Sequence, residues 1–228
     1  MALATLVPPG VVVADIGTDH AYLPIYLVQS GQVMRAVAAD ISPGSLESAR
    51  QAVTAAGLEE RISLRLGSGL SVLTPGEAEI VVIAGLGSTT IADIVALEPE
   101  VATSAQAFLL QPMTKPGDLR RRLTSLGLTL KDEKLVLDKG RFYVTMVATP
   151  GTMPAFPEEL LEIGPYLAAH PDPMLPAYLT YRIEQEKKVR AKTCFAKSAA
   201  ARARSELASH RINAWREMLY VCQWKLRS

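Results

Sequence analysis

Two aspartates flank a glycine in residues 15–20 (DIGTDH), directly after the apolar run at residues 11–16. A glycine in this position, Gly17, lets the backbone approach a ligand closely. The segment lacks the G-x-G-x-x-G spacing of dinucleotide-binding loops, and the carboxylates of Asp15 and Asp19 would repel a pyrophosphate. They suit a cationic, hydroxyl-rich ligand, so the segment argues against NAD and favours S-adenosylmethionine, which carries an amino group and a sulfonium. An ordinary strand-to-helix turn capped by Asp19 is the structural alternative.

Another acidic residue, Asp40, ends a second apolar run 25 positions beyond Asp15. In nucleotide-binding α/β folds an acid at this place accepts hydrogen bonds from ribose hydroxyls. We therefore expect Asp40 and its neighbour Ile41 to contact the cofactor. Capping of the following helix is the alternative role for Asp40, although Ser42 is the more natural cap.

Glycine-containing loops follow two further apolar runs. Gly67, Ser68 and Gly69 would leave room for a flat adenine ring, although Gly-Ser-Gly also occurs in ordinary turns. The loop after the next run and the residues after the fifth run are expected to face the methyl group and the methyl acceptor. We assign to the cofactor Ala84, Gly85, Leu86, Gly87 and Gln111, and to the acceptor Pro112 and Met113.

Short apolar runs alternate with segments of helical spacing, which predicts an α/β fold with a parallel sheet and helices on both faces. Strands are expected at residues 11–16, 35–40, 62–66, 79–84 and 106–111, and helices at about 20–30, 43–56, 88–97 and 116–126. Two further strand-like runs, 128–137 and 142–149, flank the turn residues 138–141 and predict an antiparallel hairpin at the edge. Ligands of such sheets bind at the carboxyl ends of the strands, where the loops described above lie.

The pattern changes after residue 150. Residues 150–154 (PGTMP) have the composition of a linker, and the remainder shows no strand signal. A short helix is expected at about residues 157–169, followed by an antiparallel helical hairpin with a break around residues 198–204. We therefore expect two domains, residues 1–150 and residues 151–228.

Charge is divided unevenly along the 228 residues, whose formal net charge is +1. Residues 174–228 carry 12 basic and four acidic side chains, a net charge of +8, whereas residues 1–173 carry a net charge of −7. An acidic body with a basic arm suggests a polyanionic partner such as nucleic acid for the arm. A solvated helical face, kept soluble by its lysines, is the alternative.

Composition excludes several other classes of protein. An apolar share of 49% and a charged share of 21% are typical of a globular protein rather than a disordered one. Two cysteines cannot form a disulfide framework or a four-cysteine zinc site, and no metal is expected. No apolar run approaches the roughly 20 residues that span a bilayer, and the first residues lack a basic region, so we expect a cytoplasmic protein.

Taken together, these segments make the chain resemble the bacterial tRNA (adenine-N1)-methyltransferases that modify adenine 22, the TrmK family. Six segments in the expected order carry the resemblance: DIGTDHAYLP (residues 15–24), GSGL (67–70), IAGLG (83–87), LQP (110–112), KGRFY (139–143) and IGPYL (163–167). The resemblance implies a class I, Rossmann-like methyltransferase domain that binds S-adenosylmethionine. It also implies a coiled-coil-like helical domain that helps to hold tRNA.

Two positions depart from the family pattern. This chain has Ser88 where the family typically has a glycine, and Met113 where the family usually has an asparagine. An asparagine would offer a polar contact to the target base, whereas methionine offers an apolar one. The departures bear on the acceptor more than on the cofactor.

The chemistry implied by the resemblance needs little from the enzyme beyond alignment. N1 of neutral adenine has an in-plane lone pair and can attack a methyl group without deprotonation, so proximity supplies most of the acceleration. Because the product ring is cationic, a carboxylate helps to stabilise it, and Asp19 with His20 beside it is our candidate pair. His20 as a helix cap is the alternative. We also assign Thr18 and His20 to the cofactor loop and Tyr22 to stacking on the base, with a core position as the alternative for Tyr22.

Adenine N1 lies on the Watson–Crick edge, so the target base must be unpaired when it reacts. The basic arm is therefore expected to grip the tRNA backbone through phosphate contacts. The candidate tRNA contacts are Lys187, Lys188, Arg190 and Lys192 on the arm and Arg120 and Arg121 near the expected active site. Solvated surface is the alternative for these arginines.

Three other functions remain as alternatives. The first is a class I methyltransferase acting on another RNA site, a protein or a small molecule. The second is an inactive homologue that binds cofactor and RNA, which Ser88 and Met113 make conceivable. The third, an NAD-linked oxidoreductase, is disfavoured by the missing glycine fingerprint and by Asp19. The expected oligomeric state is a monomer or a weak homodimer.

Overall fold

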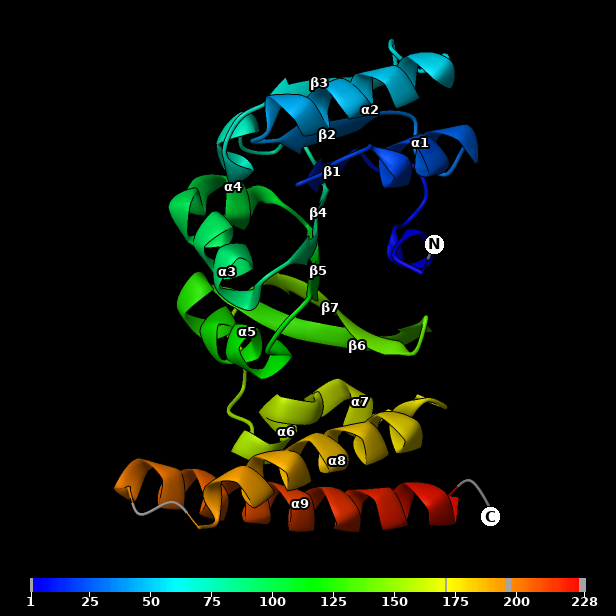
Figure 1. The fold of residues 1–228 in the computed structure, drawn as a ribbon. Coiled ribbons are helices and arrows are strands. Elements are labelled where there is room, and N and C mark those ends of the chain that lie inside the picture. Colours follow the sequence, from blue (N-terminus) through cyan, green and yellow to red (C-terminus); the bar gives the residue numbers. More distant parts are fainter. Residues whose placement is uncertain (1, 171, 196–197, 226–228) are drawn as a thin grey trace. The chain divides into compact units, whose positions relative to one another are not determined.

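The computed structural model describes residues 2–170, 172–195 and 198–225, with side chains as far as residue 222. The chain divides into two compact units, Met1–Ala155 and Phe156–Ser228. Each unit has its own secondary-structure class, as Figure 1 shows: the first is α/β and the second is helical.

Seven strands form one mixed sheet in the first unit, in the order β3-β2-β1-β4-β5-β7-β6. The strands are β1 (Val13–Ile16), β2 (Ala36–Asp40), β3 (Ile62–Leu66), β4 (Ile80–Leu86), β5 (Ala107–Pro112), β6 (Leu128–Asp138) and β7 (Arg141–Pro150). Strands β1 to β5 pair in parallel, and β7 pairs antiparallel with both β5 and β6. The predicted α/β fold with an antiparallel hairpin is confirmed. Strand order reverses between β1 and β4, the place where ligands bind in open α/β sheets.

Helices cover both faces of this sheet. They are α1 (Tyr22–Gln29), α2 (Pro43–Ala55), α3 (Ser88–Leu97), α4 (Pro99–Ser104) and α5 (Pro116–Leu123), with short 3-10 turns η1 (Ala4–Leu6), η2 (Gly69–Val72) and η3 (Thr124–Leu126). Figure 1 shows α3, α4 and α5 on one face and α1 on the other. Buried side chains of α1 and α2, such as Leu27 and Val53, pack with Ala36 and Ala38 of β2, so α2 shares the face of α1.

Several local predictions in the first unit are confirmed, and the predicted start of its first helix is wrong. Ser42 caps α2 by accepting a hydrogen bond from the Ser45 amide at 3.3 Å, and Gly127 ends the turn after α5 in the left-handed conformation. Helix α1, however, begins at Tyr22 rather than near His20. The later start follows from the left-handed backbone of Ala21, which cannot continue an α-helix.

The described residues of the second unit form four helices: α6 (Glu158–Ile163), α7 (Pro165–Ala169), α8 (Leu175–Thr193) and α9 (Ala199–Lys225). The single helix expected at residues 157–169 is divided, because Gly164 at φ 127° and the following proline interrupt it. The hairpin break comes earlier than the expected 198–204, since Ala199 already belongs to α9. The Ser198 hydroxyl caps α9 by accepting a hydrogen bond from the Ala201 amide at 3.2 Å.

A partly buried ion network joins helices of the second unit. Arg211 on α9 donates to Glu162 of α6 at 2.9 Å and to Glu186 of α8 at 3.2 Å. Arg182 on α8 also donates to Glu162, at 2.9 Å, and its guanidinium lies 5.1 Å from the ring centre of Trp215. Since contacts run from 182 to 215 and from 186 to 211, α8 and α9 are antiparallel. Charge-assisted hydrogen bonds from two arginines thus link α6, α8 and α9.

An ion pair is also buried within the first unit. Arg120 of α5 and Glu133 of β6 have no exposed side-chain surface, and the Arg120 Nε donates to the Glu133 Oε1 at 2.7 Å. An ion pair without solvent is sensitive to the loss of either member, because the remaining charge stays buried.

We predict that Arg120→Met destabilises the first unit by about 3–5 kcal/mol, because it leaves the Glu133 carboxylate buried without its cation. The double change Arg120→Met with Glu133→Leu should recover most of this loss. Urea unfolding followed by circular dichroism measures both. The control is Arg122→Met, which breaks the exposed pair with Asp93 and should change stability by less than about 1 kcal/mol. A single mutant as stable as the control would contradict the structural role of the pair.

Candidate active site

The loop between β1 and α1 is wound tightly around the end of β2. Gly17, Asp19 and Ala21 all have positive φ, of 79°, 53° and 55°. The amides of Gly17 and Thr18 both donate to the carbonyl of Ala39, at 2.8 and 3.0 Å. Left-handed conformations at two non-glycine residues are strained, and such strain concentrates at functional sites.

Carboxylates from β1 and β2 lie at the edges of this loop. Asp15 is buried and accepts a hydrogen bond from the Thr18 hydroxyl at 2.6 Å. Asp40 accepts from the Ser42 amide at 2.8 Å through Oδ1 and from the Asp19 amide at 3.2 Å through Oδ2. Both predicted roles of Asp40 are thus compatible, because each carboxylate oxygen has a second lone pair.

Electrostatics at Asp15 favour a cationic ligand. Burial raises the pKa of the Asp15 carboxyl to about 6, the hydrogen bond from Thr18 lowers it, and the negative charge of Asp40 raises it. A positive group placed here would relieve the repulsion and favour the ionised form. The ammonium of an amino-acid moiety has the charge and the donors to do so.

The next loop along the edge presents glycines and exposed apolar side chains. Gly67 donates its amide to the carbonyl of Asp40 at 3.1 Å. A Cβ on Gly67 would lie only 2.5 Å from the Val72 side chain, so any larger residue there would force Val72 to shift. Ile41 and Leu66 are 71% and 57% exposed at the ends of neighbouring strands, and they can contact a flat aromatic ring. Leu66 was not among the predicted residues, although its position opposite Asp40 in the sheet register identifies it.

Residues after β4 and β5 form the other side of the site. The register of these strands shifts between Ala84 and Leu86, and Gly85 has a φ of 77°. The Met113 amide donates to the carbonyl of Leu86 at 2.8 Å, which joins the two loops. The side-chain amide of Gln111 lies 3.4 Å from the Thr145 hydroxyl of β7.

Ser88, one of the departures from the family pattern, has a structural explanation. It is buried at the start of α3, and its hydroxyl lies within hydrogen-bonding distance of the carbonyls of Thr114 and Lys115, the latter at 2.8 Å. A glycine at this position has no hydroxyl to offer these carbonyls. Ser88 therefore helps to fix the segment that follows Met113.

The candidate catalytic pair lies on the exposed side of the first loop. The His20 Nε2 and the Asp19 Oδ2 are 3.5 Å apart, and their side chains are 42% and 67% exposed. The His20 ring stacks on Tyr22 with ring centres 5.2 Å apart and an angle of 22° between the planes. Tyr22 is itself exposed, so the alternative of a core position is wrong.

The two arginines expected near the active site differ in position. Arg120 is fully buried against Glu133, so it cannot lie on a surface that contacts tRNA. The sequence alone does not show which of the three consecutive arginines, residues 120–122, faces the inside of the unit. Arg121 is partly exposed and pairs with Asp118 at 2.8 Å.

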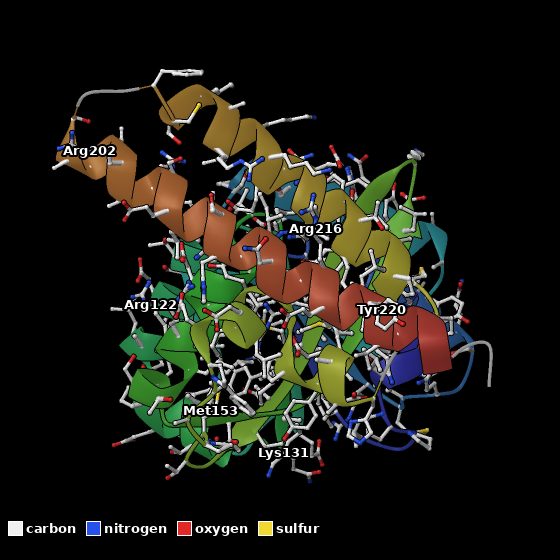
Figure 2. The ribbon with its side chains drawn as sticks, turned by 90° about the horizontal axis from the view of Figure 1, so that it is seen from below. Arg122, Lys131, Met153, Arg202, Arg216 and Tyr220 are labelled. Atoms are coloured by element: carbon white, nitrogen blue, oxygen red, sulfur yellow. The ribbon has the colours of Figure 1, made fainter. Side chains whose placement is uncertain are left out.

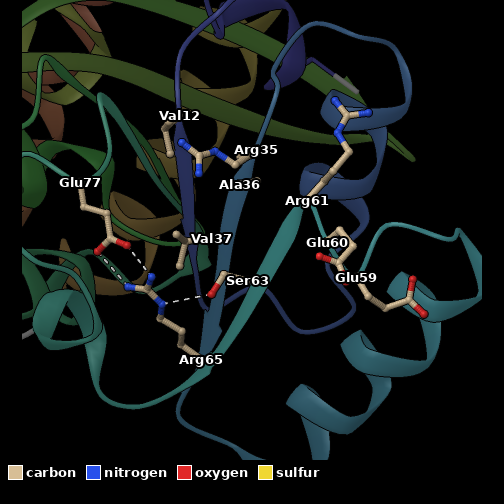
Figure 3. Close-up of a pocket in the computed structure, with 10 residues that line it drawn as sticks. All are labelled: Val12, Arg35, Ala36, Val37, Glu59, Glu60, Arg61, Ser63, Arg65 and Glu77. Carbon is tan, nitrogen blue, oxygen red and sulfur yellow. Dashed lines mark hydrogen bonds and ion pairs between the residues drawn. The ribbon is translucent and has the colours of Figure 1, made fainter.

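A hollow of about 370 Å³ lies elsewhere on the first unit. It is lined mostly by residues that precede or begin strands β1 to β3, together with Arg65 near the end of β3 and Glu77 before β4. Figure 3 shows Arg35, Arg61 and the Arg65–Glu77 pair around it. The hydrogen bond from Arg65 lowers the pKa of Glu77 to about 2. Most of these residues lie at the amino ends of the strands, and none of them is a predicted site residue, so the hollow differs from the candidate active site at the carboxyl ends.

Exposed basic side chains gather in the second unit. Lys188, Arg190 and Lys192 are exposed on α8, and Lys187 pairs with Glu184. Figure 2 labels Arg202 near the start of α9 and Arg216 farther along it. Lys197 and Arg227, which contribute to the charge of the arm, lie outside the described residues.

Neither a metal-binding cluster nor a membrane-spanning helix is found among the described residues. No group of three or more histidine, cysteine, aspartate or glutamate side chains among them is placed to hold a metal ion. Within the same residues, no helix combines the length and apolar character needed to cross a membrane.

Comparison with known proteins agrees with this geometry. Residues 1–146 match the family model of a methyltransferase domain. The tRNA (adenine(22)-N(1))-methyltransferase of Bacillus subtilis is 36% identical over 171 residues, which cover 73% of this chain and 72% of the relative. The crystal structure of the B. subtilis M1A22 tRNA methyltransferase TrmK covers 96% of both chains with a TM-score of 0.84 at 28% identity. Streptococcus pneumoniae Sp1610 in complex with S-adenosyl-L-methionine gives the same coverage, TM-score and identity. The chain therefore belongs to the tRNA (adenine(22)-N1)-methyltransferase family, the TrmK family of Rossmann-like methyltransferases.

Proposed function

We propose that this chain transfers a methyl group from S-adenosylmethionine to N1 of an adenine in tRNA, at position 22. The observation that carries the proposal is the set of three aspartates, Asp15, Asp19 and Asp40, gathered around a glycine turn at the carboxyl edge of the sheet. The family membership supplies the acceptor. A cytoplasmic location and a monomer or weak homodimer belong to the same proposal.

The residues present fit the cofactor. Asp15, beside the turn at Gly17, is suited to the ammonium group, and the two oxygens of Asp40 are suited to the ribose hydroxyls. The exposed side chains of Ile41 and Leu66 can cover the adenine ring, beside the turn of Gly67 to Gly69. When bound, S-adenosylmethionine supplies an electrophilic methyl group. The residues expected at its methyl end are those after β4, Ala84 to Gly87, with Gln111 of β5.

The chain's own residues then have to orient the acceptor and accommodate positive charge. Adenine N1 needs no general base, so Asp19 acts as a negative charge beside the cationic product ring. His20 contacts Asp19 and stacks on Tyr22, which fixes the direction of both rings. Tyr22 offers its other face to the target base. The opposite wall is assigned to Met113, which is partly exposed, and to its neighbour Pro112, which is buried.

The target adenine must leave any base pair before it reacts, and this costs free energy. Phosphate contacts by Lys187, Lys188, Arg190 and Lys192 would offset part of that cost through binding, with Arg121 as a further contact. We leave Arg120 out of this set because of its burial.

Incubation of the protein with bulk tRNA and labelled S-adenosylmethionine, followed by nucleoside identification, tests the proposal. We expect 1-methyladenosine, mapped to position 22. A different methylated product would support another acceptor. Binding of cofactor and tRNA without any product would indicate an inactive homologue.

Cofactor affinity should rise with pH between about 5 and 7. Because the pKa of Asp15 is raised to about 6, this side chain is mostly protonated at pH 5 and gains its charge as pH rises. Affinity should be up to about tenfold weaker at pH 5 than at pH 7. Calorimetry on Asp15→Asn should show a flat profile, whereas Glu47→Gln, an exposed control, should keep the slope. An unchanged slope in Asp15→Asn would refute the role of Asp15.

The raised pKa of Asp15 also affects the stability of the free protein. Whereas cofactor affinity should rise with pH, this contribution to stability should fall. Between pH 3.8, the ordinary pKa of an aspartate, and about pH 6, the folded chain holds a proton on Asp15 that the unfolded chain releases. This contribution to stability is therefore present at low pH and is lost as pH rises through that window.

Asp40→Ala should weaken cofactor binding by roughly 100-fold, because it removes both acceptors for the ribose hydroxyls as well as the hydrogen bond to the Asp19 amide. Calorimetry at pH 7 measures this change. Glu47→Gln again serves as the control, since it removes a nearby exposed carboxylate. Wild-type affinity in Asp40→Ala would exclude the ribose contact.

Neutralising the exposed cations of α8 should weaken tRNA binding and reduce its dependence on salt. For Lys188, Arg190 and Lys192 changed together to glutamine, the slope of log affinity against log salt should become shallower by about two to three. The control is Arg50, Lys131 and Lys134 changed to glutamine, three cations of the first unit. Equal losses in both triple variants would show that total charge, and not the arm, governs binding.

A further inference from the structure

The β6–β7 hairpin extends past the carboxyl end of β5. Pairing of β5 with β7 ends at Leu110 opposite Met146, whereas β6 and β7 remain paired as far as Asp138 opposite Arg141. The five residues Arg141 to Thr145 therefore continue beyond the paired part of β5, on the edge that holds the candidate active site. This overhang carries the KGRFY segment, to which the sequence resemblance gave no role.

One side chain of the overhang holds the loop after β5. The guanidinium of Arg141 donates to the carbonyl of Met113 at 2.8 Å. The same guanidinium lies 5.4 Å from the ring centre of Tyr143, a cation–π contact that restricts its position. Lys139 and Gly140 form the tight turn just before it, both with positive φ, so the start of β7 is fixed by backbone geometry.

The loop that Arg141 contacts is held on its other sides as well. The Met113 amide donates to Leu86 at the end of β4, and Ser88 of α3 bonds to the carbonyls of Thr114 and Lys115. Lys115 has a left-handed backbone, with a φ of 48°. Three elements thus fix both sides of one peptide segment, and Arg141 is the member that reaches it from the exposed rim.

We propose that Arg141 is a positioning residue for the methyl acceptor. By holding the Met113 carbonyl it sets the plane of that peptide, and with it the direction of the Met113 side chain. This inference rests on the proposed function, in which Pro112 and Met113 form the wall against the target base. Misplacement of such a wall by about 1 Å can slow a reaction by roughly 100-fold.

A phosphate contact is the competing role for an exposed arginine beside an RNA-binding site. Comparison with the neighbouring Lys139 distinguishes that role from the positioning of the Met113 loop. Lys139 is an exposed cation in the same turn, and within the described part of the chain its side chain makes no hydrogen bond or ion pair. Arg141→Met and Lys139→Met each remove one positive charge from the same turn. Only the first removes the hydrogen bond to Met113.

The test combines amide hydrogen exchange with steady-state methylation of tRNA. In Arg141→Met, exchange of the Met113 amide should become several-fold faster and kcat should fall by roughly 10- to 100-fold. Affinities for S-adenosylmethionine and tRNA should stay within about twofold of wild type. Lys139→Met should change none of these quantities, and Arg141→Lys, which keeps a donor, should recover part of kcat.

Two results would overturn the inference. Equal effects of Arg141→Met and Lys139→Met would indicate a role for charge alone. Weaker tRNA binding with a reduced salt slope and unchanged kcat in Arg141→Met would indicate a phosphate contact. Failure of the proposed function is distinguishable, because a wild-type protein that methylates no tRNA would overturn that function, while hydrogen exchange still decides whether Arg141 holds the loop.

Discussion

Burial of the Asp15 carboxyl at the end of a parallel strand, beside a second carboxylate on the adjacent strand, is the constraint on which the candidate site depends. Burial disfavours the charged form of Asp15 and the negative charge of Asp40 disfavours it further, so the pKa of Asp15 rises to about 6. The loop between them is strained, with left-handed backbone at Asp19 and Ala21. A bound cation relieves the repulsion, and a strained loop around charged groups is typical of a site organised in advance of its ligand.

Hydrogen bonds, and not repulsion between carboxylates, organise the part of the candidate site that is proposed to face the methyl acceptor. Ser88 and Met113, the two departures from the family pattern, belong to one segment that β4, α3 and β7 hold together. In this chain a serine hydroxyl fixes the segment, and the side chain at position 113 contributes an apolar surface. The two departures therefore concern the same wall of the site.

Much of the fold could be predicted because local signals agreed with the tertiary structure. The alternation of apolar runs with helical spacing gave the parallel strands, and Ser42 and Gly127 marked helix boundaries that the structure confirms. Three features could not be predicted from spacing. Arg120 is buried by the packing of α5 on β6, Ala21 delays α1 through its backbone conformation, and Arg141 reaches Met113 across 28 positions of sequence. The first and third depend on contacts between distant residues, and the second is a backbone conformation that alanine rarely adopts, so none of them follows from spacing.

A crystal structure of the protein with S-adenosylmethionine tests the central claim most directly. We expect the ammonium group within hydrogen-bonding distance of the β1–α1 loop at Asp15 and Gly17. Both ribose hydroxyls should bind Asp40, and the adenine ring should lie between Ile41 and the turn at Gly67. Binding at the hollow beside Arg35 and Arg65, or no binding at saturating concentration, would contradict the claim.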